Sequence, residues 1–477
     1  MDTISKKYIL NVIAHNIEYL EMQYKYSKLK CLEKFDESKH RYDFIQLLDQ
    51  LDYSGRYPVG TYYAFDEYTP LNIDEYFSRN NFSDDVMKNI GQIKKDMVEQ
   101  HNIFKKYVKK PEGDLATNLN IFYNYAHYEI RDFIIKDKNA EMCTNAWVKM
   151  YDLIMANLRH QFVDGSIKQL RSFHMCELPG AFIAALNHFT KTFMKCELNW
   201  TAQSLFDARS KNMLSDQYGL YKTYKKNYDL GVTGTGDLYE TKNVEAYVEK
   251  YGKEHFDIIT SDCGEELDEG ADVKEDQITE LQWHQFIVAI GLKPDVYFCK
   301  LYSTYTKNTN KLIMLANVFF KNVKLYKPYT VKITSDEVYL CCKNPRNYDS
   351  SIWKKLLRTN IDDIMIDKNF HDHMYTYTKM FFLERSLNMN YMLFVYNNIE
   401  YILKKNNDSC SGGVPRIKVF QNLTRIVRNG LIYSYVNGIL MLQPINEKDK
   451  LLPNVKTAKA FDQNFGMDIE FIDCSKK

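Results

Sequence analysis

Short apolar runs alternate with longer amphipathic runs through the middle of the chain, between about residues 130 and 346. The short runs have the length of buried strands, and the longer runs repeat apolar residues at helical spacing. This alternation predicts an α/β fold in which a doubly wound, Rossmann-like parallel sheet carries helices on both faces. The expected strands are 172–178, 198–205, 256–262, 296–302, 323–326 and 338–342, and the expected helices lie at 181 onward, 244–251, 278–292 and 311–320.

The two ends of the chain have a different pattern, which is mainly helical. Residues 1–129 carry helical periodicity at 9–20 and 86–97, interrupted by the turn-forming segment 54–60. Beyond residue 346 the periodicity returns at 375–397 and 417–440, with a loop rich in Asn, Ser and Gly at 406–415. The pattern therefore predicts three regions: 1–129, 130–346 and 347–477.

Composition narrows the class of protein. Across 477 residues, 63 basic and 62 acidic residues leave a net charge of +1, so any nucleic-acid binding has to use local basic patches. The ten cysteines show no Cys-x-x-Cys or other zinc-binding spacing, and we expect reduced, mostly buried thiols and no metal. The N-terminus fails as a secretory signal, and no apolar run approaches the roughly 20 residues that span a bilayer. We expect a soluble, cytoplasmic protein.

A ligand-binding turn is indicated between the strand at 172–178 and the helix that starts at 181. The sequence there is Phe-His-Met-Cys-Glu-Leu-Pro-Gly-Ala-Phe, over residues 173–182. A short strand, an acidic residue, a Pro-Gly turn and an amphipathic helix are how many nucleotide sites begin, because small residues let a ligand approach the backbone. By itself this signal is weak.

Charged residues follow or precede the other strands. Asp262 ends one buried strand, Lys300 lies where the next apolar run stops, and Glu337 precedes a third. Lys149 lies upstream in the helix-like run Thr-Asn-Ala-Trp-Val-Lys-Met-Tyr, over residues 144–151. Singly, each residue is more simply explained as a solvated charge or a helix cap.

The order Lys149, Asp262, Lys300 and Glu337, around a Glu-Leu-Pro-Gly-Ala-Phe turn, resembles the FtsJ-like (RrmJ-like) RNA 2′-O-methyltransferase family. The phrases at 144–151 and 176–189 are most similar to the versions in large cytoplasmic DNA viruses such as asfarviruses. The resemblance covers roughly residues 130–346. It implies the methyltransferase fold with an antiparallel sheet edge, here the pair 323–326 and 338–342.

The resemblance also implies S-adenosylmethionine as cofactor and assigns residues to it. The turn would face the methionine moiety with its backbone amides, although Leu178 and Ala181 replace two glycines of the usual Gly-Pro-Gly-Gly-Phe motif. Asp237 would hold the adenine amino group, and Asp262 would lie near the sulfonium. The implied cofactor-binding residues are Glu177, Leu178, Pro179, Gly180, Ala181, Phe182, Asn199, Trp200, Asp237 and Asp262. Plain core packing is an equally good explanation for Trp200.

The chemistry of ribose methylation explains why two lysines and two carboxylates are needed. The 2′-hydroxyl is a poor nucleophile whose proton must be removed, and a lysine can remove it only as the neutral amine. We expect Lys300 to be the base, with a pKa lowered by burial and by the second cation, Lys149. Asp262 would orient Lys300, and Glu337 would position a lysine and the ribose.

Substrate and partners are less defined by the sequence. The run 218–228 interleaves tyrosines with Lys222, Lys225 and Lys226, a composition suited to RNA but also ordinary in a chain rich in both residues. The acidic run 265–269 and the pair His371 and His373 are expected on the surface, without a metal. No Asp/Asn-Pro-Pro-aromatic motif is present, which argues against methylation of an exocyclic amine.

The expected function is S-adenosylmethionine-dependent RNA 2′-O-methylation, and the viral resemblance implies the cap-proximal ribose of mRNA. Two alternatives stay open: a ribose methyltransferase of rRNA or tRNA, and an inactive subunit that binds RNA or a capping partner. The expected partners are RNA and the capping or transcription machinery, with no membrane.

Overall fold

The computed structural model describes residues 61–65, 68–77, 85–107, 127–159, 167–206, 215–264, 275, 277–331, 335–407 and 432–453. Helical segments expected at 9–20 and in most of 417–440, the turn at 54–60 and the acidic run 265–269 lie outside these residues. Among the described residues, no helix combines the length and apolarity needed to cross a bilayer.

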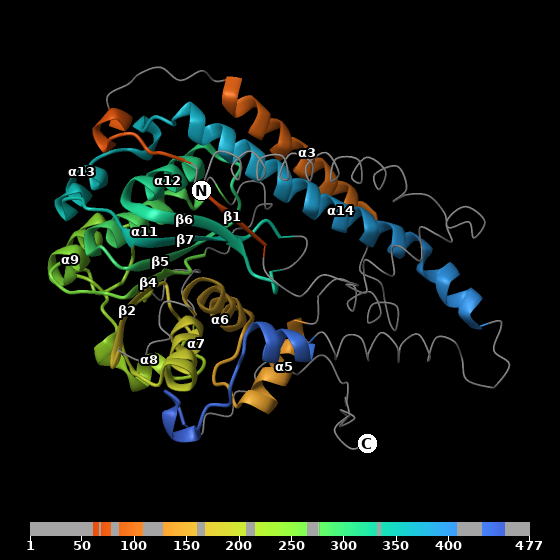
Figure 1. The fold of residues 1–477 in the computed structure, drawn as a ribbon, viewed down its shortest axis with the longest axis horizontal. Helices are drawn as coiled ribbons and strands as arrows, with labels where there is room; N and C mark the ends of the chain where they lie inside the picture. The colour runs from red at the N-terminus through yellow and green to blue at the C-terminus, as the bar shows by residue number, and fades with distance from the viewer. Residues whose placement is uncertain are drawn as a thin grey trace, which may run out of the picture.

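A seven-stranded sheet runs through the molecule in the order β1-β6-β7-β5-β4-β2-β3 (Figure 1). The strands β3, β2, β4 and β5 are parallel, as expected, whereas β7 is antiparallel to both β5 and β6. The bounds are β1 Thr61–Ala64, β2 Gln169–Met175, β3 Glu197–Gln203, β4 Ile258–Ser261, β5 Val296–Leu301, β6 Phe320–Lys327 and β7 Val338–Pro345.

Helices cover both faces of this sheet. One face carries α9, α11, α12 and α13, and the other carries α5, α6 and α7 (Figure 1). Their bounds are α5 His127–Lys138, α6 Asn145–Leu158, α7 Ala181–Phe189, α8 Leu220–Thr223, α9 Thr241–Tyr251, α11 Thr279–Leu292, α12 Lys307–Phe319 and α13 Trp353–Leu357. The 3₁₀ segments are Ile73–Phe77, Lys225–Asn227, Ser350–Ile352, Ile361–Asp363 and Glu447–Asp449, and the π-helical ones are Thr190–Met194 and Ser434–Ile439.

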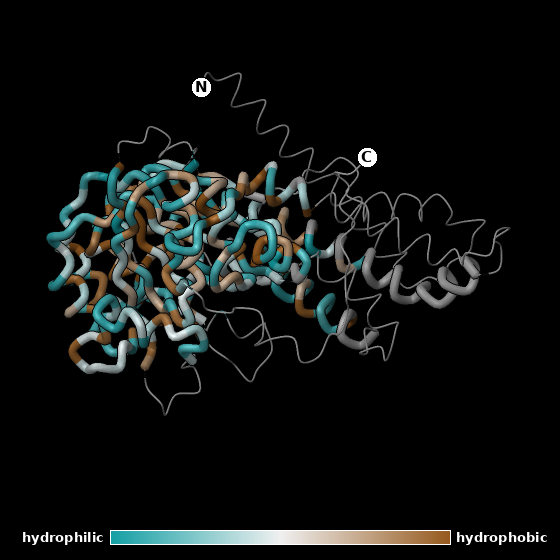
Figure 2. Tube along the Cα trace, turned by 90° about the horizontal axis from the view of Figure 1, so that it is seen from below, coloured by the Kyte–Doolittle hydropathy of each residue, from teal (hydrophilic) through white to brown (hydrophobic). Residues whose placement is uncertain are grey.

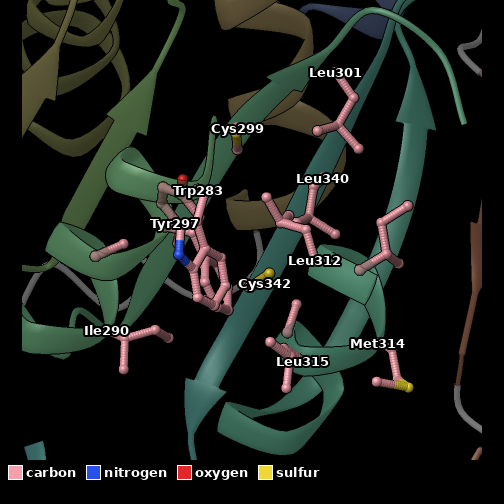
Figure 3. Packing of buried hydrophobic residues seen from close by; sticks show 14 of the residues in the cluster. Trp283, Ile290, Tyr297, Cys299, Leu301, Leu312, Met314, Leu315, Leu340 and Cys342 are labelled. Carbon is pink, nitrogen blue, oxygen red and sulfur yellow. The ribbon is translucent and has the colours of Figure 1, made fainter. Parts of the chain in front are cut away.

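The central strand β5 is mainly apolar, as is usual for a strand with both faces buried. Along β5, Val296 and Phe298 point into the core under α6 and α7, whereas Tyr297 and Cys299 point into the core under α11 and α12. Figure 3 shows Tyr297 and Cys299 in the second of these cores, among side chains of α11 and α12. Among the residues coloured in Figure 2, many of the outer turns are hydrophilic, and hydrophobic segments are frequent inside.

Both flanking regions contribute to this core. The edge strand β1 pairs with β6, with Thr61 opposite Lys327, although no strand was expected in residues 1–129. Two long helices, α3 (Asp85–Tyr107) and α14 (Lys368–Asn407), lie side by side and extend past the sheet (Figure 1). The separation into regions 1–129, 130–346 and 347–477 stays a prediction.

Candidate active site

Two parallel strands and one antiparallel strand bring three charged residues to one edge of the sheet. Asp262 follows β4, and Lys300 lies near the carboxyl end of β5. Because β7 is antiparallel to β5, with Val338 opposite Leu301, Glu337 also lies at this edge. Open α/β sheets bind their ligands outside the carboxyl ends of their strands, so this is where a ligand site is expected.

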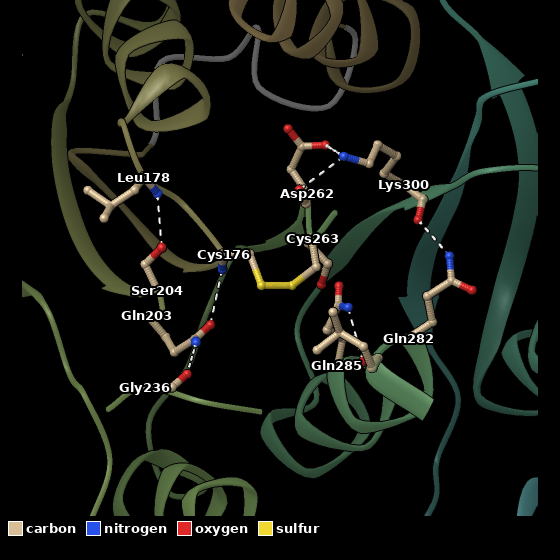
Figure 4. Close-up of a disulfide and its surroundings, with 12 residues drawn as sticks. Cys176, Leu178, Gln203, Ser204, Gly236, Asp262, Cys263, Gln282, Gln285 and Lys300 are labelled. Carbon is tan, nitrogen blue, oxygen red and sulfur yellow. Dashed lines mark hydrogen bonds and ion pairs between the residues drawn. A yellow bond between two sulfur atoms is a disulfide. The ribbon is translucent and has the colours of Figure 1, made fainter. Parts of the chain in front are cut away.

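Lys300 and Asp262 form the first ion pair of the site. The Lys300 Nζ lies 2.8 Å from Asp262 Oδ1 and also donates to the Asp262 backbone carbonyl at 3.1 Å (Figure 4). Gly264 follows closely, and a Cβ there would clash with the Tyr302 hydroxyl and crowd the Lys300 Nζ. The lysine is therefore held on the turn after β4 by two oxygens of one residue.

Lys149 and Glu337 form the second ion pair, with 2.7 Å between Nζ and Oε1. Lys149 lies on α6, whose first turn is capped by the Thr144 hydroxyl, which accepts from the Trp147 amide. The four side chains of the two pairs keep between 14% and 20% of their surface exposed. A partly exposed cluster of two cations and two anions can bind a polar substrate without leaving an isolated buried charge.

Charges within the cluster set the pKa values of Lys300 and Glu337. Burial lowers the pKa of Lys300, but the carboxylate of Asp262, with Tyr302 and Glu337, outweighs this, so its pKa is raised above the ordinary value. The expectation of a lowered pKa is therefore wrong for this arrangement. Burial raises the pKa of Glu337, yet Lys149 and then Lys300 bring it below its ordinary range. Lys300 is therefore an ammonium group at neutral pH.

Asp152 fixes the helix that carries Lys149. Its buried carboxylate accepts from the Tyr326 hydroxyl at 2.6 Å, the Tyr329 amide at 3.0 Å and the Tyr435 hydroxyl at 2.9 Å. These donors come from β6, from the turn after it and from the C-terminal segment. Asp152 lies one turn beyond Lys149, so this network fixes α6 against the sheet edge.

The turn at 177–182 has its acidic side chain pointing inward. Glu177 Oε1 accepts from the backbone amides of Phe182 at 2.8 Å and Ile183 at 3.0 Å. Burial raises the pKa of Glu177 well above its ordinary value, and nearby Asp262 adds to this effect. The amide of Phe182 is thus already bonded, which leaves Gly180 and Ala181 as the amides of the turn that a ligand could use.

Two glycines are required at the neighbouring turns. Gly180 has a φ of 109°, and a Cβ there would collide with Leu220. Gly236 has a φ of 66°, and a Cβ there would collide with the Ser204 carbonyl. Next to it, Asp237 uses Oδ1 to accept from the Tyr239 amide at 2.9 Å. The turn after β2 and the loop before α9 are thus closely packed around their glycines.

The structure does not bring Asn199 and Trp200 to this edge. They pair with Arg171 and Ser172, well before the carboxyl end of β3. Trp200 is buried and meets the rings of Tyr224 and Tyr228 at centroid distances of 5.5 and 5.7 Å, so core packing explains it.

The residues of β3 that do reach the edge are Gln203 and Ser204. Gln203 accepts from the Cys176 amide at 3.0 Å and donates to the Gly236 carbonyl. The Ser204 hydroxyl accepts from the Leu178 amide at 3.2 Å. Strand register, which was not read from the sequence, distinguishes these two residues from Asn199 and Trp200.

Tyr339 is a further residue of the site that sequence reasoning missed. Its buried hydroxyl bonds to Glu337, and its ring lies 6.3 Å from that of Phe182. The period of two along a strand puts residues 337 and 339 on the same face, and this was the signal available in the sequence.

Cys176 and Cys263 form a disulfide beside the site, with 4.9 Å between their Cα atoms (Figure 4). The expectation of reduced thiols is wrong for these two cysteines. Five others are free and buried: Cys143, Cys196, Cys299, Cys341 and Cys342. The disulfide joins the ends of β2 and β4, the strands that carry the turn at 177–182 and Asp262.

Two groups of possible metal ligands lie elsewhere. His255, Asp257 and Asp295 lie close together at the opposite edge of the sheet, where β4 and β5 begin. His371, expected on the surface, is instead buried, and His373 bonds to the Tyr63 hydroxyl at 3.2 Å. The start of α14 packs beside β1, where Phe370 meets Phe65 and Tyr377 meets Tyr63, which explains the difference. None of these residues contacts the two ion pairs.

Comparison with known proteins shows what part of this chain is similar to. Residues 142–345 match the model of the FtsJ-like methyltransferase family. A probable methyltransferase of African swine fever virus is 28% identical over 61% of this chain and 71% of its own length. A cap-specific mRNA (nucleoside-2′-O-)-methyltransferase 2 of Danio rerio is 29% identical over 43% of this chain and 28% of its own length.

Two further proteins are similar to part of this chain. An uncharacterised protein of Acanthamoeba polyphaga mimivirus is 27% identical over 65% of this chain, and the match spans 40% of that protein. A solved structure of a putative ribosomal RNA methyltransferase of Plasmodium falciparum is 17% identical. It covers 42% of this chain and 97% of its own chain, with a TM-score of 0.28. The family match includes both ion pairs and the turn at 177–182. Over residues 142–345 this chain is therefore similar to FtsJ-like methyltransferases.

Proposed function

We propose that this domain transfers a methyl group from S-adenosylmethionine to a ribose 2′-hydroxyl of RNA, at a nucleotide next to the mRNA cap. The observation that carries the proposal is the pair of lysine–carboxylate contacts at one sheet edge, Lys300 with Asp262 and Lys149 with Glu337. Two lysines and two carboxylates in a partly exposed cluster beside a glycine-containing turn suit this reaction, which needs a base, groups that orient it and a nearby cofactor.

Within this proposal, Lys300 takes the proton from the 2′-hydroxyl. Its Nζ is fixed by Asp262, so the amine is held in one place when the substrate arrives. Lys149 and Glu337 would position the ribose, and Tyr339 orients Glu337. Since the pKa of Lys300 is raised, only a small fraction is neutral at pH 7, and the rate should be limited by that fraction.

The residues present fit S-adenosylmethionine. Gly180 and Gly236 stand where a Cβ would clash with neighbouring atoms. The backbone turns around the proposed site are therefore tight, and tight glycine turns let a ligand approach the backbone closely. The Asp262 carboxylate, 20% exposed, offers a negative charge next to these turns. When bound, the cofactor supplies an electrophilic methyl group on a sulfonium, whose positive charge opposes the raised pKa of Lys300.

The cap-proximal ribose is proposed as substrate because of what the relatives are named for. The Danio rerio relative is named as a cap-specific mRNA 2′-O-methyltransferase, and others of that name occur in Mus musculus and Drosophila melanogaster. The basic residues Lys222, Lys225 and Lys226 are exposed and could contact phosphates. Cytoplasmic location and association with capping machinery stay predictions.

The test of this proposal uses the full chain, labelled S-adenosylmethionine and three RNAs: a capped transcript, the same transcript uncapped, and ribosomal RNA. We expect label in the capped transcript, and nuclease digestion with mass analysis should place it on a ribose next to the cap. Equal labelling of uncapped RNA would contradict the cap assignment. Labelling of a base would contradict ribose transfer.

A further inference from the structure

Helix α14 lies outside the residues that match the family model, yet it contacts two loops, the one that follows Lys300 and the one that precedes β7 and carries Glu337. The Thr378 hydroxyl lies 3.3 Å from that of Thr304, in the loop that follows Lys300. Arg385, seven residues further along α14, places its Nε 3.3 Å from Asp336 Oδ1. Residues seven apart share one face of a helix, so a single face of α14 touches both loops.

Asp336 connects these contacts to the active site. It immediately precedes Glu337, and its Oδ1 also accepts from the Tyr305 hydroxyl at 3.1 Å. The carboxylate therefore ties together the loop after β5, the start of β7 and α14. On its other side, the same start of β7 is held by Lys327, whose Nζ donates to the Ser335 carbonyl at 2.6 Å.

The pairing of Arg385 with Asp336 is unusually protected for an ion pair. The Arg385 side chain is 3% exposed and that of Asp336 is 18% exposed. A buried guanidinium is costly unless it is paired, and removing one partner of such a pair leaves an uncompensated charge. If helix packing were the pair's only role, two hydrophobic residues could fill it. The charged pair is therefore better explained by the segment before β7 that it holds in place.

We propose that α14 is part of the active site and that Arg385 is a positioning residue that holds Glu337 through Asp336. This inference rests on the proposed function for its effect on transfer. Without Arg385, the segment before β7 would lose its contact with α14, and Glu337 would no longer be fixed against Lys149. Loss of alignment in a catalytic cluster lowers the transfer rate and leaves the binding of a cofactor held by other turns nearly unchanged.

The chain offers a matched control for general loosening of the helix. Gln100 of α3 donates to the Ser386 carbonyl at 3.0 Å and to Asn390 at 3.2 Å, and it accepts from the Ser386 hydroxyl at 2.7 Å. Gln100→Ala therefore weakens the packing of α14 next to Arg385 without removing a contact to Asp336.

The experiment compares Arg385→Gln, Asp336→Asn, the double variant and Gln100→Ala in the full chain. We expect Arg385→Gln and Asp336→Asn each to lower kcat by at least about tenfold, with the Kd for S-adenosylmethionine within about twofold of the parent. The double variant should be no worse than either single one, because both remove the same contact. Gln100→Ala should keep nearly the parent rate.

Hydrogen exchange of the backbone at 335–340 provides a readout that does not depend on activity. Exchange there should be faster in Arg385→Gln and Asp336→Asn than in the parent and Gln100→Ala. A parent-like rate and parent-like exchange in Arg385→Gln would overturn the proposal, as would an equal loss of rate in Gln100→Ala. If Arg385→Gln does not fold, Asp336→Asn decides. If the parent chain transfers no methyl group, the proposed function fails, and exchange alone decides whether Arg385 holds this segment.

Discussion

Lys149 and Glu337 are 188 positions apart in the chain, yet their charged atoms lie 2.7 Å from each other. The contact depends on α6 crossing the sheet edge where β7 begins. It leaves Lys300 free to pair with Asp262, so each lysine of the site has its own carboxylate. This division of charges determines how the site should respond to pH.

The rate of methyl transfer should rise with pH through the neutral range. The pKa of Lys300 is raised, mainly because the attraction of Asp262 outweighs burial, so the neutral amine is the minor form at pH 7. Each pH unit below that pKa changes the neutral fraction about tenfold, so single-turnover rates should climb by about one logarithmic unit per pH unit from pH 6. The measurement is a pH series at saturating cofactor. A rate that is flat between pH 6 and 8 would contradict the assignment of Lys300 as base.

Replacing Lys222, Lys225 and Lys226 together by alanine should weaken RNA binding and flatten its salt dependence. Each phosphate contact to single-stranded RNA contributes roughly 0.7 to the slope of log affinity against log salt, so losing all three should reduce the slope by about two. The matched control replaces three exposed residues: Lys354 and Lys355 of α13, and Arg358 at its C-terminal cap. Equal slopes in the two triple variants would mean that the 218–228 run does not bind RNA.

Tyr228 should behave as a core residue and not as a base-stacking residue. Its ring is buried and meets Trp200 and Tyr221 at centroid distances of 5.7 and 5.2 Å. Tyr228→Ala should therefore lower the free energy of unfolding by about 3 kcal/mol, in the range for aromatic truncation in cores. Denaturant titration measures this loss. If the variant kept the parent stability but bound RNA more weakly, Tyr228 would be a base-stacking residue and not a core residue.

Much of the fold could be predicted because it depends on local pattern. The strands β2, β4 and β5 are short runs that contain apolar residues, and α9 and α11 follow longer helix-like runs, so these strands and helices were predicted to within a few residues. The edge strand β1 was missed because its four residues form a strand only by pairing with β6. The site residues Lys149, Asp262, Lys300 and Glu337 came from the resemblance, not from periodicity.

The features of the site that the sequence did not predict depend on contacts between residues far apart in the sequence. The raised pKa of Lys300 follows from its contact with Asp262, which no sequence spacing reveals. Cys176 and Cys263 are 87 positions apart, and each stands alone in the sequence. The distance of Asn199 and Trp200 from the carboxyl ends of the strands depends on the register of β3 against β2, which no sequence spacing reveals.

Reduction of the Cys176–Cys263 disulfide should lower the free energy of unfolding. A crosslink between positions 87 apart constrains the unfolded chain, and removing such a bond typically costs about 3 kcal/mol. Denaturant titrations with and without reductant measure the loss, and Cys263→Ser should remove the difference between them. Non-reducing peptide mapping that finds both thiols free in the purified protein would contradict the bond.

The most direct test of the account is the effect of Lys300→Ala on methyl transfer compared with cofactor binding. The account predicts a loss of at least about a hundredfold in single-turnover rate on capped RNA, while calorimetry gives a nearly unchanged Kd for S-adenosylmethionine. Lys355→Ala, which breaks an exposed ion pair with Asp74, is the control and should transfer at the parent rate. A Lys300→Ala variant that keeps the parent rate would contradict the central claim, because the proton of the 2′-hydroxyl would then leave by another route.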